Sequence, residues 1–351
     1  LMSTKFVQPE MSRSPSPELV GMDPADVDLG ALRKTVEASR DFLLGLQKPE
    51  GYWVGELFVD TTVACDYHLL MYLRNKIDRV KEAKIVRHIL QRQLPDGGWP
   101  IYPGGPSNVT ATVKAYFSLK LAGFTPEEPE MRKARATALR LGGIPRTNTY
   151  CKLYLAMLGQ YPWRYLPNIP PEILLLPNWA PFNLFEMSSW TRAIVVPLSI
   201  IRSFRPTQHL PPEKQLHELY PYGVEGGPFH HPVESRFFSM KNFFVRVNEL
   251  LGWIESLSWK PFRRRALKVA EKWILDRTGP ESEGLAAIFP SMMNAILAFQ
   301  CLGYAEDHPA MRKAVKDLEG LEVDDPENGD FRIQPCLSPV WDTAITLTAL
   351  G

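Results

Sequence analysis

Apolar residues recur along most of this chain at the three- and four-residue spacing of an amphipathic helix. Short segments rich in Gly and Pro separate these runs, and no alternating strand pattern competes with them. The first run, with Leu32, Val36 and Leu43 on one face, predicts a helix up to about residue 46. Further helices are predicted over residues 61–73, 80–94, 108–121, 130–141, 147–158, 188–202, 234–257, 263–275, 287–302, 309–318 and 339–350. Many such helices with short turns predict an all-α fold of paired helices, either a solenoid or a closed α-α barrel.

Two of the predicted helix ends share a glutamine, a glycine and a tryptophan at fixed offsets. The two copies are Gln47-x-x-x-Gly51-x-Trp53 and Gln93-x-x-x-Gly97-x-Trp99. Glycine permits a positive φ where a helix ends. The glutamine amide can bond the backbone groups that the helix end leaves free, and the indole can pack on the apolar face. We expect these six residues to be structural, each set tying one helix end to the next.

Composition narrows the class of protein. The chain has 351 residues, of which 45% are hydrophobic, enough for a large core, and 23% are charged, as on an ordinary soluble surface. A formal net charge of +1 argues against a nucleic-acid-binding protein, which would usually carry a basic stripe. The four cysteines form no C-x-x-C pair, so the sequence indicates neither a zinc site nor a redox motif. No apolar run is long enough to predict a membrane-spanning helix.

For two further segments the sequence predicts the absence of a feature: a signal peptide in one and a metal site in the other. Residues 1–30 contain Ser-Pro-Ser-Pro and lack the apolar stretch of a signal peptide, so we expect a partly disordered lead-in. The adjacent His230 and His231 lie in a loop rich in Pro and Gly, with no acidic or cysteine ligand at a helical offset. We therefore predict no metal site at this pair.

Several short motifs follow one another in the order found in a known enzyme family. They are Gly159-Gln-Tyr-Pro-Trp163, Ser188-Ser-Trp-Thr-Arg192, Val196-Pro-Leu-Ser-Ile200, Pro261-Phe-Arg263, Ala287-Ile-Phe-Pro290 and Ser338-Pro-Val-Trp-Asp-Thr343. Together with the two Gln/Gly/Trp turns, this ordered set resembles the N-terminal portion of the squalene–hopene cyclases and related triterpene cyclases. The resemblance implies an isomerase that cyclises squalene or a similar polyprenoid through cations, without a metal or an organic cofactor.

The family's fold places one α-α barrel inside the sequence of another. By resemblance, residues 1–30 are the lead-in and residues 31–57 an arm of the second barrel. Residues 58–325 would form the inserted barrel, and residues 326–351 would begin the second, catalytic barrel.

The family's proton donor is an Asp-x-Asp-Asp motif that follows the Ser-Pro-Val-Trp-Asp-Thr segment, and these 351 residues do not contain it. The nearest match, Glu322-x-Asp324-Asp325, lies before that segment and beside a Pro/Gly turn. We interpret it as a solvated acidic loop, because an exposed carboxyl keeps an ordinary pKa and cannot protonate an alkene. We therefore expect the isolated chain to be inactive as a cyclase and to expose apolar surface where a second barrel would dock.

The resemblance assigns cavity residues position by position. Trp190 and Trp341 correspond to cavity tryptophans, whose ring faces would attract cationic intermediates. Tyr150 stands where the family usually has Phe, so its hydroxyl group would need a partner. Ile288 matches a position that shapes the folded substrate. The alternative for each tryptophan is an ordinary place in the core.

Three more positions match the wall or the water network of the family's cavity. Phe289 replaces a polar residue of some relatives, Met187 matches the channel constriction, and Asp66 matches an acidic position of the network that ends the cascade. An alternative for Asp66 is a structural carboxylate paired with a cation such as Arg74.

One segment, residues 236–247, is apolar on more than one face and carries cations at its edges. Its aromatic members are Phe237, Phe238, Phe243 and Phe244. Such a helix suits a membrane interface, with the cations at the lipid headgroups, although an ordinary core helix with extended cations is the alternative. The resemblance also implies a monotopic protein on the cytoplasmic side of a membrane, and a homodimer is a further option.

Two other functions stay open at this point. One is a non-catalytic lipid-binding or scaffold half-protein that pairs with a separate catalytic chain. The other is part of a class II diterpene cyclase acting on a diphosphate, for which the sequence shows no evident basic pocket.

Overall fold

A computed structural model of the chain describes residues 28–180, 183–224, 239–257, 259–325 and 329–351. These residues divide into two compact units. Unit 1 comprises the described residues up to Gly55 together with Ser338–Gly351, and unit 2 is Glu56–Leu337. Unit 2 is thus inserted in the sequence between the two parts of unit 1. The assignment of residues 31–57 and 326–351 to a second barrel stays a prediction, and residues 1–27 of the predicted lead-in lie outside the described residues.

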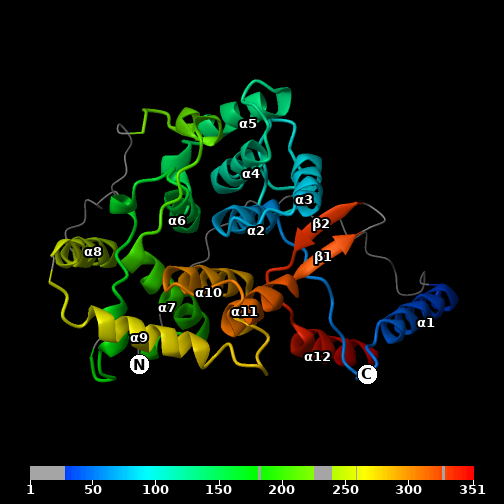
Figure 1. The fold of residues 1–351 in the computed structure, drawn as a ribbon. Helices are drawn as coiled ribbons and strands as arrows, with labels where there is room; N and C mark the ends of the chain where they lie inside the picture. Colours follow the sequence, from blue (N-terminus) through cyan, green and yellow to red (C-terminus); the bar gives the residue numbers. More distant parts are fainter. Residues whose placement is uncertain (1–27, 181–182, 225–238, 258, 326–328) are drawn as a thin grey trace. The chain divides into compact units, whose positions relative to one another are not determined.

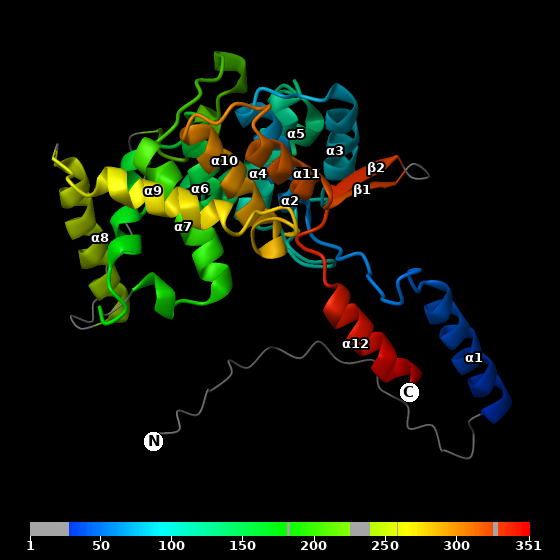
Figure 2. The same cartoon turned by 60° about the horizontal axis from the view of Figure 1, so that its bottom comes forward.

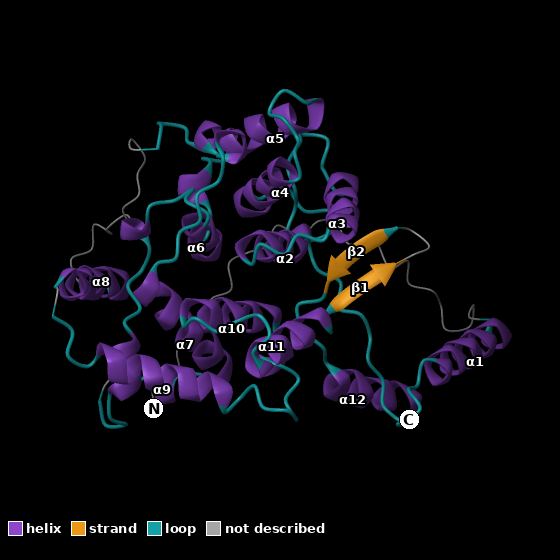
Figure 3. Cartoon of the chain, in the orientation of Figure 1, coloured by secondary structure: helices purple, strands orange, loops and turns teal. Residues whose placement is uncertain are grey.

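Unit 2 consists mainly of helices joined by short turns and 3-10 segments (Figure 3). Its α-helices are α2 (Thr61–Leu73), α3 (Arg79–Gln91), α4 (Val109–Leu121), α5 (Pro129–Arg140), α6 (Thr149–Met157), α7 (Ser189–Phe204), α8 (Met240–Ser256), α9 (Arg263–Leu275), α10 (Phe289–Cys301) and α11 (Pro309–Glu319). Asp60, Asn108 and Asn148 cap α2, α4 and α6 by accepting hydrogen bonds from free backbone N–H groups of the first turn. The helices α2 and α9 have the predicted bounds.

The helices of unit 2 form an inner and an outer layer. Residues 110–121 of α4 are all buried, and α10 is buried along nearly its whole length. By contrast, α5 and α11 bury a single stripe, which in α11 consists of Met311, Ala314 and Leu318. The inner α4 packs between α2 and α5, and α10 packs between α7 and α11 (Figures 1 and 2). Buried inner helices covered by one-sided outer helices are the two layers of an α-α barrel, so the predicted all-α fold of this type is confirmed.

The expectation that no strand is present is wrong for one segment. The strand β1 (Glu322–Asp325) pairs antiparallel with β2 (Asp330–Ile333), and this hairpin lies beside α3 and α2 (Figure 1). A buried pair fastens it to α3, because His88 Nδ1 lies 2.7 Å from Asp330 Oδ1. The segment has too few residues for a periodic pattern to identify it from the sequence.

The prediction of a solvated acidic loop at the same place is wrong for the backbone, which forms a strand, while Asp324 is exposed as predicted. Glu322 Oε2 accepts a hydrogen bond from Lys81 Nζ at 2.7 Å, and Asp324 Oδ1 accepts one from Lys84 Nζ at 2.6 Å. Both lysines belong to α3, about 240 residues earlier in the chain. The acidic residues therefore hold the hairpin against a helix, and a contact of such sequence separation leaves no local pattern.

The two Gln/Gly/Trp turns have the same hydrogen bonds. In each, the glutamine amide donates to the carbonyl of the glycine, at 3.0 Å in the first copy and 2.9 Å in the second. The indole N–H donates to a carbonyl ten residues before it, at 2.6 and 2.8 Å. Gly51 and Gly97 have φ values of +90° and +89°, which L side chains rarely adopt. Trp53 and Trp99 are both buried.

Unit 1 contains α1 (Leu29–Gly45) and α12 (Pro339–Leu350). Backbone N–H groups near the end of its first part bond side chains of α12: Trp53 N donates to Thr343 Oγ1 at 3.0 Å, and Gly55 N donates to Asp342 Oδ2 at 2.9 Å. Neither helix contains a buried residue. Both helices therefore present apolar side chains to solvent.

We predict that Gly97→Ala lowers the free energy of unfolding by at least about 3 kcal/mol, because a left-handed backbone and a steric clash act together. A Cβ atom at Gly97 would lie 2.4 Å from Lys133 Cβ and 2.5 Å from the Lys133 carbonyl carbon. The matched control is Gly123→Ala, also in unit 2, where φ is +109° and no atom lies within 4 Å of the new Cβ. It should cost about 1–2 kcal/mol. Urea unfolding followed by circular dichroism gives both values, and equal costs would contradict the clash.

Candidate functional site

Four of the predicted cavity residues lie on two elements that pack together. Met187 precedes α7 and is partly buried, and Trp190 lies in the first turn of α7 with 62% of its surface exposed. Ile288 and Phe289 are buried where α10 begins. The 3-10 turn Leu285–Ala287, directly before Ile288, contacts α7. The structure thus brings Trp190 and Ile288 onto neighbouring elements, while their contact with a substrate stays a prediction.

Trp341, the second predicted cavity tryptophan, lies in α12 of unit 1 and is 71% exposed. The alternative interpretation of either tryptophan as an ordinary core residue is wrong for the described structure, because neither indole is buried. Trp53 and Trp99, expected to be structural, are buried instead.

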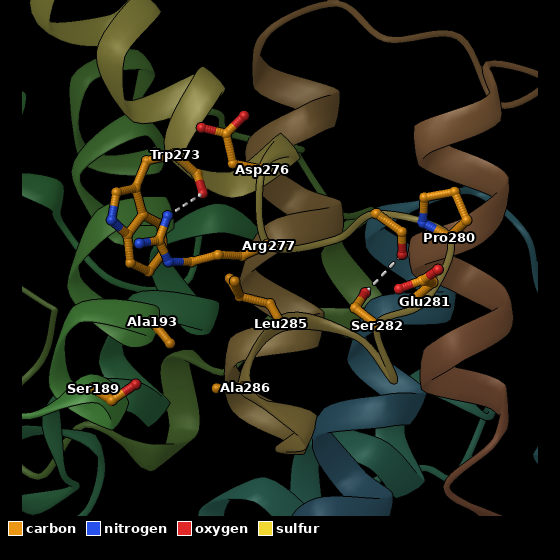
Figure 4. Close-up of a pocket in the computed structure, with 11 residues that line it drawn as sticks. Ser189, Ala193, Trp273, Asp276, Arg277, Pro280, Glu281, Ser282, Leu285 and Ala286 are labelled. Carbon is orange, nitrogen blue, oxygen red and sulfur yellow. Dashed lines mark hydrogen bonds between the residues drawn. The ribbon is translucent and has the colours of Figure 1, made fainter.

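A groove of about 670 Å³ separates the start of α7 from the segment that links α9 to α10 (Figure 4). Ser189 and Ala193 of α7 line one side of it. On the other side the guanidinium of Arg277 lies 4.0 Å from the ring centre of Trp273 and donates to the Trp273 carbonyl oxygen at 3.2 Å. The positive charge of this groove is therefore already stacked on an aromatic ring.

The carboxylates of this groove are unsuited to act as strong acids. Asp276 is exposed and accepts hydrogen bonds from Lys272 Nζ at 2.8 Å, and Glu281 is also exposed. A group that protonates an alkene has to be buried and short of partners, so that its neutral form is favoured and its proton is released to the substrate. The groove offers shape and an aromatic face, and neither of its carboxylates meets that requirement.

A smaller cavity of about 190 Å³ opens on another face of α7. Tyr150 and Leu153 of α6, Leu166 and Pro167 of the following loop, and Val195 and Leu198 of α7 form most of its wall. Burial raises the pKa of the Tyr150 phenol, which therefore stays neutral at ordinary pH. The structure thus places Tyr150 in the wall of an almost wholly apolar cavity.

A third cavity, of about 380 Å³, shares the wall at Pro167 with the smaller one. Asn168 and residues of α8, including Phe244, Val247 and Leu251, line it. The amide of Asn168 joins the loop to α8, because its backbone N–H donates to Asn248 Oδ1 at 2.8 Å. Two apolar cavities, one lined by α7 and the other by α8, therefore lie on either side of the loop that contains Pro167.

Trp190 lines neither the large groove nor the small cavity. It precedes Ala193 of the groove by three residues and Ile194 of the small cavity by four, so it lies about one helical turn before both. Its exposed indole is therefore near the two sites without forming part of either wall.

Asp66 lies inside the barrel and pairs with Lys114 of α4 at 2.7 Å, with 13% and 6% of the two side chains exposed. The alternative prediction that Asp66 pairs with Arg74 is wrong, because Arg74 pairs with Glu306 at 2.6 Å. Burial raises the pKa of Asp66, and the neighbouring ammonium group of Lys114 opposes that rise. Asp66 Oδ1 has no hydrogen-bond partner among the described residues.

Aromatic and polar side chains connect Asp66 with Tyr150 across the core. Lys114 Nζ lies 6.0 Å from the ring centre of Tyr154, and the rings of Tyr154 and Tyr150 are 6.4 Å apart. The Tyr154 hydroxyl donates to Asn294 Oδ1 of α10 at 3.3 Å. Sequence reasoning missed Lys114, Tyr154 and Asn294, although a polar residue in a helix apolar on every side was an available signal.

The most deeply buried carboxylates of unit 2 also have cationic or hydrogen-bonding partners. Burial alone would raise the pKa of Glu82, but hydrogen bonds from His68, Arg79 and Tyr72 outweigh it and lower that pKa to about 2. The residues Asp330 and Glu255 likewise have lowered pKa values, against the effect of burial, because basic side chains pair with them. These carboxylates are ionised at ordinary pH and act as structural anions.

The metal and membrane predictions concern some residues that the structure describes and some that it does not. Where the structure describes the chain, no three His, Cys, Asp or Glu side chains are grouped so as to hold a metal ion, and His230 and His231 lie outside it. None of the helices in the described ranges is long and apolar enough to cross a membrane. Phe237 and Phe238 also lie outside the described residues.

The described part of the predicted membrane segment, residues 239–247, includes the first half of α8. Phe243 and Phe244 are 45% and 51% exposed, and their rings lie edge to face with centres 5.4 Å apart. Farther along the same helix Leu250 and Trp253 are exposed as well. An ordinary core helix would bury these side chains, and α8 does not.

Comparison with known proteins agrees with this fold. The family described as "Squalene-hopene cyclase N-terminal domain" matches residues 36–327. Squalene–hopene cyclase of Alicyclobacillus acidocaldarius subsp. acidocaldarius is 36% identical over 92% of this chain and 50% of that protein. The enzyme of the same name from Zymomonas mobilis subsp. mobilis is 35% identical over 88% of this chain and 47% of that protein. Dammaradiene synthase of Dryopteris crassirhizoma is 30% identical over 91% of this chain and 46% of that protein. The chain spans about half the length of the curated relatives it matches.

We predict that Lys114→Met lowers the free energy of unfolding by about 3–5 kcal/mol, because it leaves the Asp66 carboxylate buried without a cation. Adding Asp66→Asn should restore most of that loss, since the amide carries no charge. The control is Lys84→Met, whose partner Asp324 is half-exposed and whose loss should cost about 1 kcal/mol or less. Urea unfolding followed by circular dichroism measures all three variants. A cost for Lys114→Met no larger than that of the control would show that the buried pair is not a structural pair.

Proposed function

Since this chain belongs to the squalene–hopene cyclase family, we propose that it forms part of a terpene cyclase that folds and cyclises squalene or a similar polyprenoid. Such a reaction begins with protonation of a carbon–carbon double bond. Ring closures through carbocations follow, and loss of a proton or capture of water ends the sequence. The overall change is an isomerisation or a hydration, and neither requires a metal or an organic cofactor.

The observation that carries this proposal is the apolar cavity that contains Tyr150. Its wall is almost free of polar groups, which suits a hydrocarbon and excludes water that would quench a cation. Its volume of about 190 Å³ is smaller than a typical ligand pocket of about 300–1,000 Å³. The cavity would therefore hold one portion of a long chain, and the neighbouring cavity across Pro167 would hold another.

Aromatic side chains beside these cavities supply the second requirement. A cation above the face of a Trp or Tyr ring gains about 1–2 kcal/mol or more when water is excluded. Tyr150 forms part of the small cavity, and Trp190 lies one helical turn away. Ile288, Phe289 and Met187 do not line the small cavity, and in this proposal they contact other portions of the folded chain.

The proposal assigns no proton donor to these 351 residues. They contain no Asp-x-Asp-Asp motif, and the buried carboxylates described above each have a basic partner. Their contribution is to bind and shape the polyprenoid.

The test is binding of tritiated squalene, presented in detergent micelles, to the 351-residue chain. We expect saturable binding, and we expect Val195→Phe to weaken it by about tenfold or more, because the new ring fills the small cavity. Val80→Phe, on the exposed start of α3, is the matched control and should bind as the unchanged chain does. Equilibrium dialysis gives the affinities, and chromatography of the recovered lipid shows whether a cyclic product has formed.

Two outcomes contradict the proposal. Absence of saturable binding would remove its basis, and equal effects of Val195→Phe and Val80→Phe would move the binding site elsewhere. A cyclic product formed by this chain alone would show that a proton donor exists among these residues. Binding without conversion is the expected result.

We also propose that α8 contacts a lipid surface and that the protein is monotopic. Exposed Phe243, Phe244 and Trp253 support this, since large apolar side chains are costly in water and favourable at the headgroup boundary. The cavity that α8 lines would then lie close to the lipid that holds a water-insoluble substrate.

Replacing Phe243, Phe244 and Trp253 by Ser should lower the fraction of protein that sediments with phospholipid vesicles by about tenfold or more. The control replaces Tyr102 and Tyr222, which are exposed aromatic residues elsewhere in unit 2, and should sediment like the unchanged chain. Vesicle binding that survives the triple substitution would refute the assignment of α8.

A further inference from the structure

Arg202 is a buried cation in an otherwise apolar stretch of α7. Only 6% of its surface is exposed, and it follows the fully buried Ile200 and Ile201. Its Nε donates to Pro167 O at 2.9 Å, and its Nη2 donates to Asn168 Oδ1 at 2.8 Å. The guanidinium carbon also lies 5.8 Å from the ring centre of Trp163. All these partners are neutral, so the guanidinium is fixed in position without being paired with a negative charge.

The other buried cations of unit 2 differ from Arg202 in this respect. Lys114 pairs with Asp66, Lys120 with Glu218, and Arg263 with Glu172 and Glu255. No described carboxylate lies within 4.0 Å of the Arg202 guanidinium. Burial, with Arg205 nearby, lowers the pKa of Arg202 to about 10 against the weaker, opposite effect of the more distant Glu255, so the group stays charged at neutral pH. A buried charge without a counter-ion is costly, and proteins usually keep one only where a ligand or a partner supplies the opposite charge.

Arg202 also borders the small cavity. It lines the 190 Å³ cavity together with Tyr150 and Leu198, and its buried Nη1 has no hydrogen-bond partner among the described residues. Because Nε and Nη2 are held by the 166–168 loop, the position of the guanidinium is fixed. A fixed cation with one unused donor therefore borders an otherwise apolar cavity.

A ridge of side chains leads from Arg202 along α7. Leu198, Ile194 and Trp190 precede it by four, eight and twelve residues, which is the spacing of one row on a helix surface. At about 1.5 Å per residue the row extends roughly 18 Å from Arg202 to Trp190. That length suits a chain of about three isoprene units laid along the helix.

We propose that the small cavity binds a polyprenoid that ends in an anionic oxygen group, with Arg202 Nη1 as the donor to that group. The inference rests on the function proposed above and narrows its substrate class, because squalene itself carries no such group. One guanidinium and apolar walls match a single negative charge, as on a carboxylate, better than the several charges of a diphosphate. The prenyl chain would run along Leu198 and Ile194 toward Trp190.

The test compares C15 isoprenoids that differ only at the head: the carboxylic acid, the phosphate monoester and the alcohol, at pH 8, by equilibrium dialysis with the 351-residue chain. We expect the acid to bind about 10–100 times more tightly than the alcohol, the effect of one charge-assisted hydrogen bond. Arg202→Met should abolish this preference and leave the affinity for the alcohol within about threefold. Whether the acid or the phosphate binds more tightly identifies the head group.

Two further variants separate recognition from a structural role. Arg192→Met, the same substitution on the same helix outside the cavity, should keep the preference for the acid. Arg202→Lys keeps the charge without the fork of donors, so it should retain part of the preference even where Arg202→Met unfolds the protein.

Equal binding of acid and alcohol by the unchanged chain would overturn the inference and leave the proposed function intact. Equal weakening of both ligands by Arg202→Met, in a folded protein, would overturn it too, because that result is expected from a loop anchor. If the chain binds neither of these ligands nor squalene, the proposed function fails together with the inference.

Discussion

The structure depends on one constraint, which is that helices buried on every side must pair their charged groups within the protein. The helix α4 meets it with Lys114 on Asp66 and Lys120 on Glu218. Neutral polar groups are held less strictly, since in α10 Asn294 Oδ1 accepts from the Tyr154 hydroxyl while Asn294 Nδ2 has no partner among the described residues. A buried charge that loses its partner costs several times more than an exposed one. These pairs therefore fix how far each inner helix is shifted along its neighbours.

The same constraint explains why Arg202 and Tyr150 are informative. In a core where lysines and arginines are matched to carboxylates, a cation held only by neutral acceptors is an exception that packing does not require. A phenol in an apolar wall is a weaker exception, since burial keeps it neutral. Both lie on the surface of one small cavity, and this coincidence connects the energetics of the barrel with its proposed use.

The sequence was sufficient for the helices, because their stabilisation is local. The periodic runs at residues 61–73 and 263–275 gave the bounds of α2 and α9, and the Gln/Gly/Trp turns gave the positive φ of Gly51 and Gly97. Contacts between distant segments left no such pattern. Lys81 and Glu322 are 241 residues apart, so the hairpin was predicted as a loop.

The candidate site shows the same contrast between what the sequence predicts and what only contacts between distant segments reveal. Family resemblance directed attention to Tyr150 and Trp190, but it gave no reason to select Arg202, whose importance depends on a carboxylate that is missing from its surroundings. Likewise Arg74 was a reasonable partner for Asp66 by spacing, and only the packing of α2 against α4 shows that Lys114 takes that place. The sequence shows which charged residues are present, but only the fold shows which of them lack an oppositely charged neighbour.

Unit 1 is assembled from two ends of the chain, and this has a consequence for biosynthesis. When α1 leaves the ribosome, Thr343 and Asp342, which later bond the backbone at Trp53 and Gly55, have not yet been made. Residues 56–337 must be translated first, which takes roughly 15–55 s at about 5–20 residues per second. During that interval the backbone N–H groups of Trp53 and Gly55 lack the partners that they later bond. The segment that follows α1 is thus fastened only after unit 2 has been made, although it precedes unit 2 in the chain.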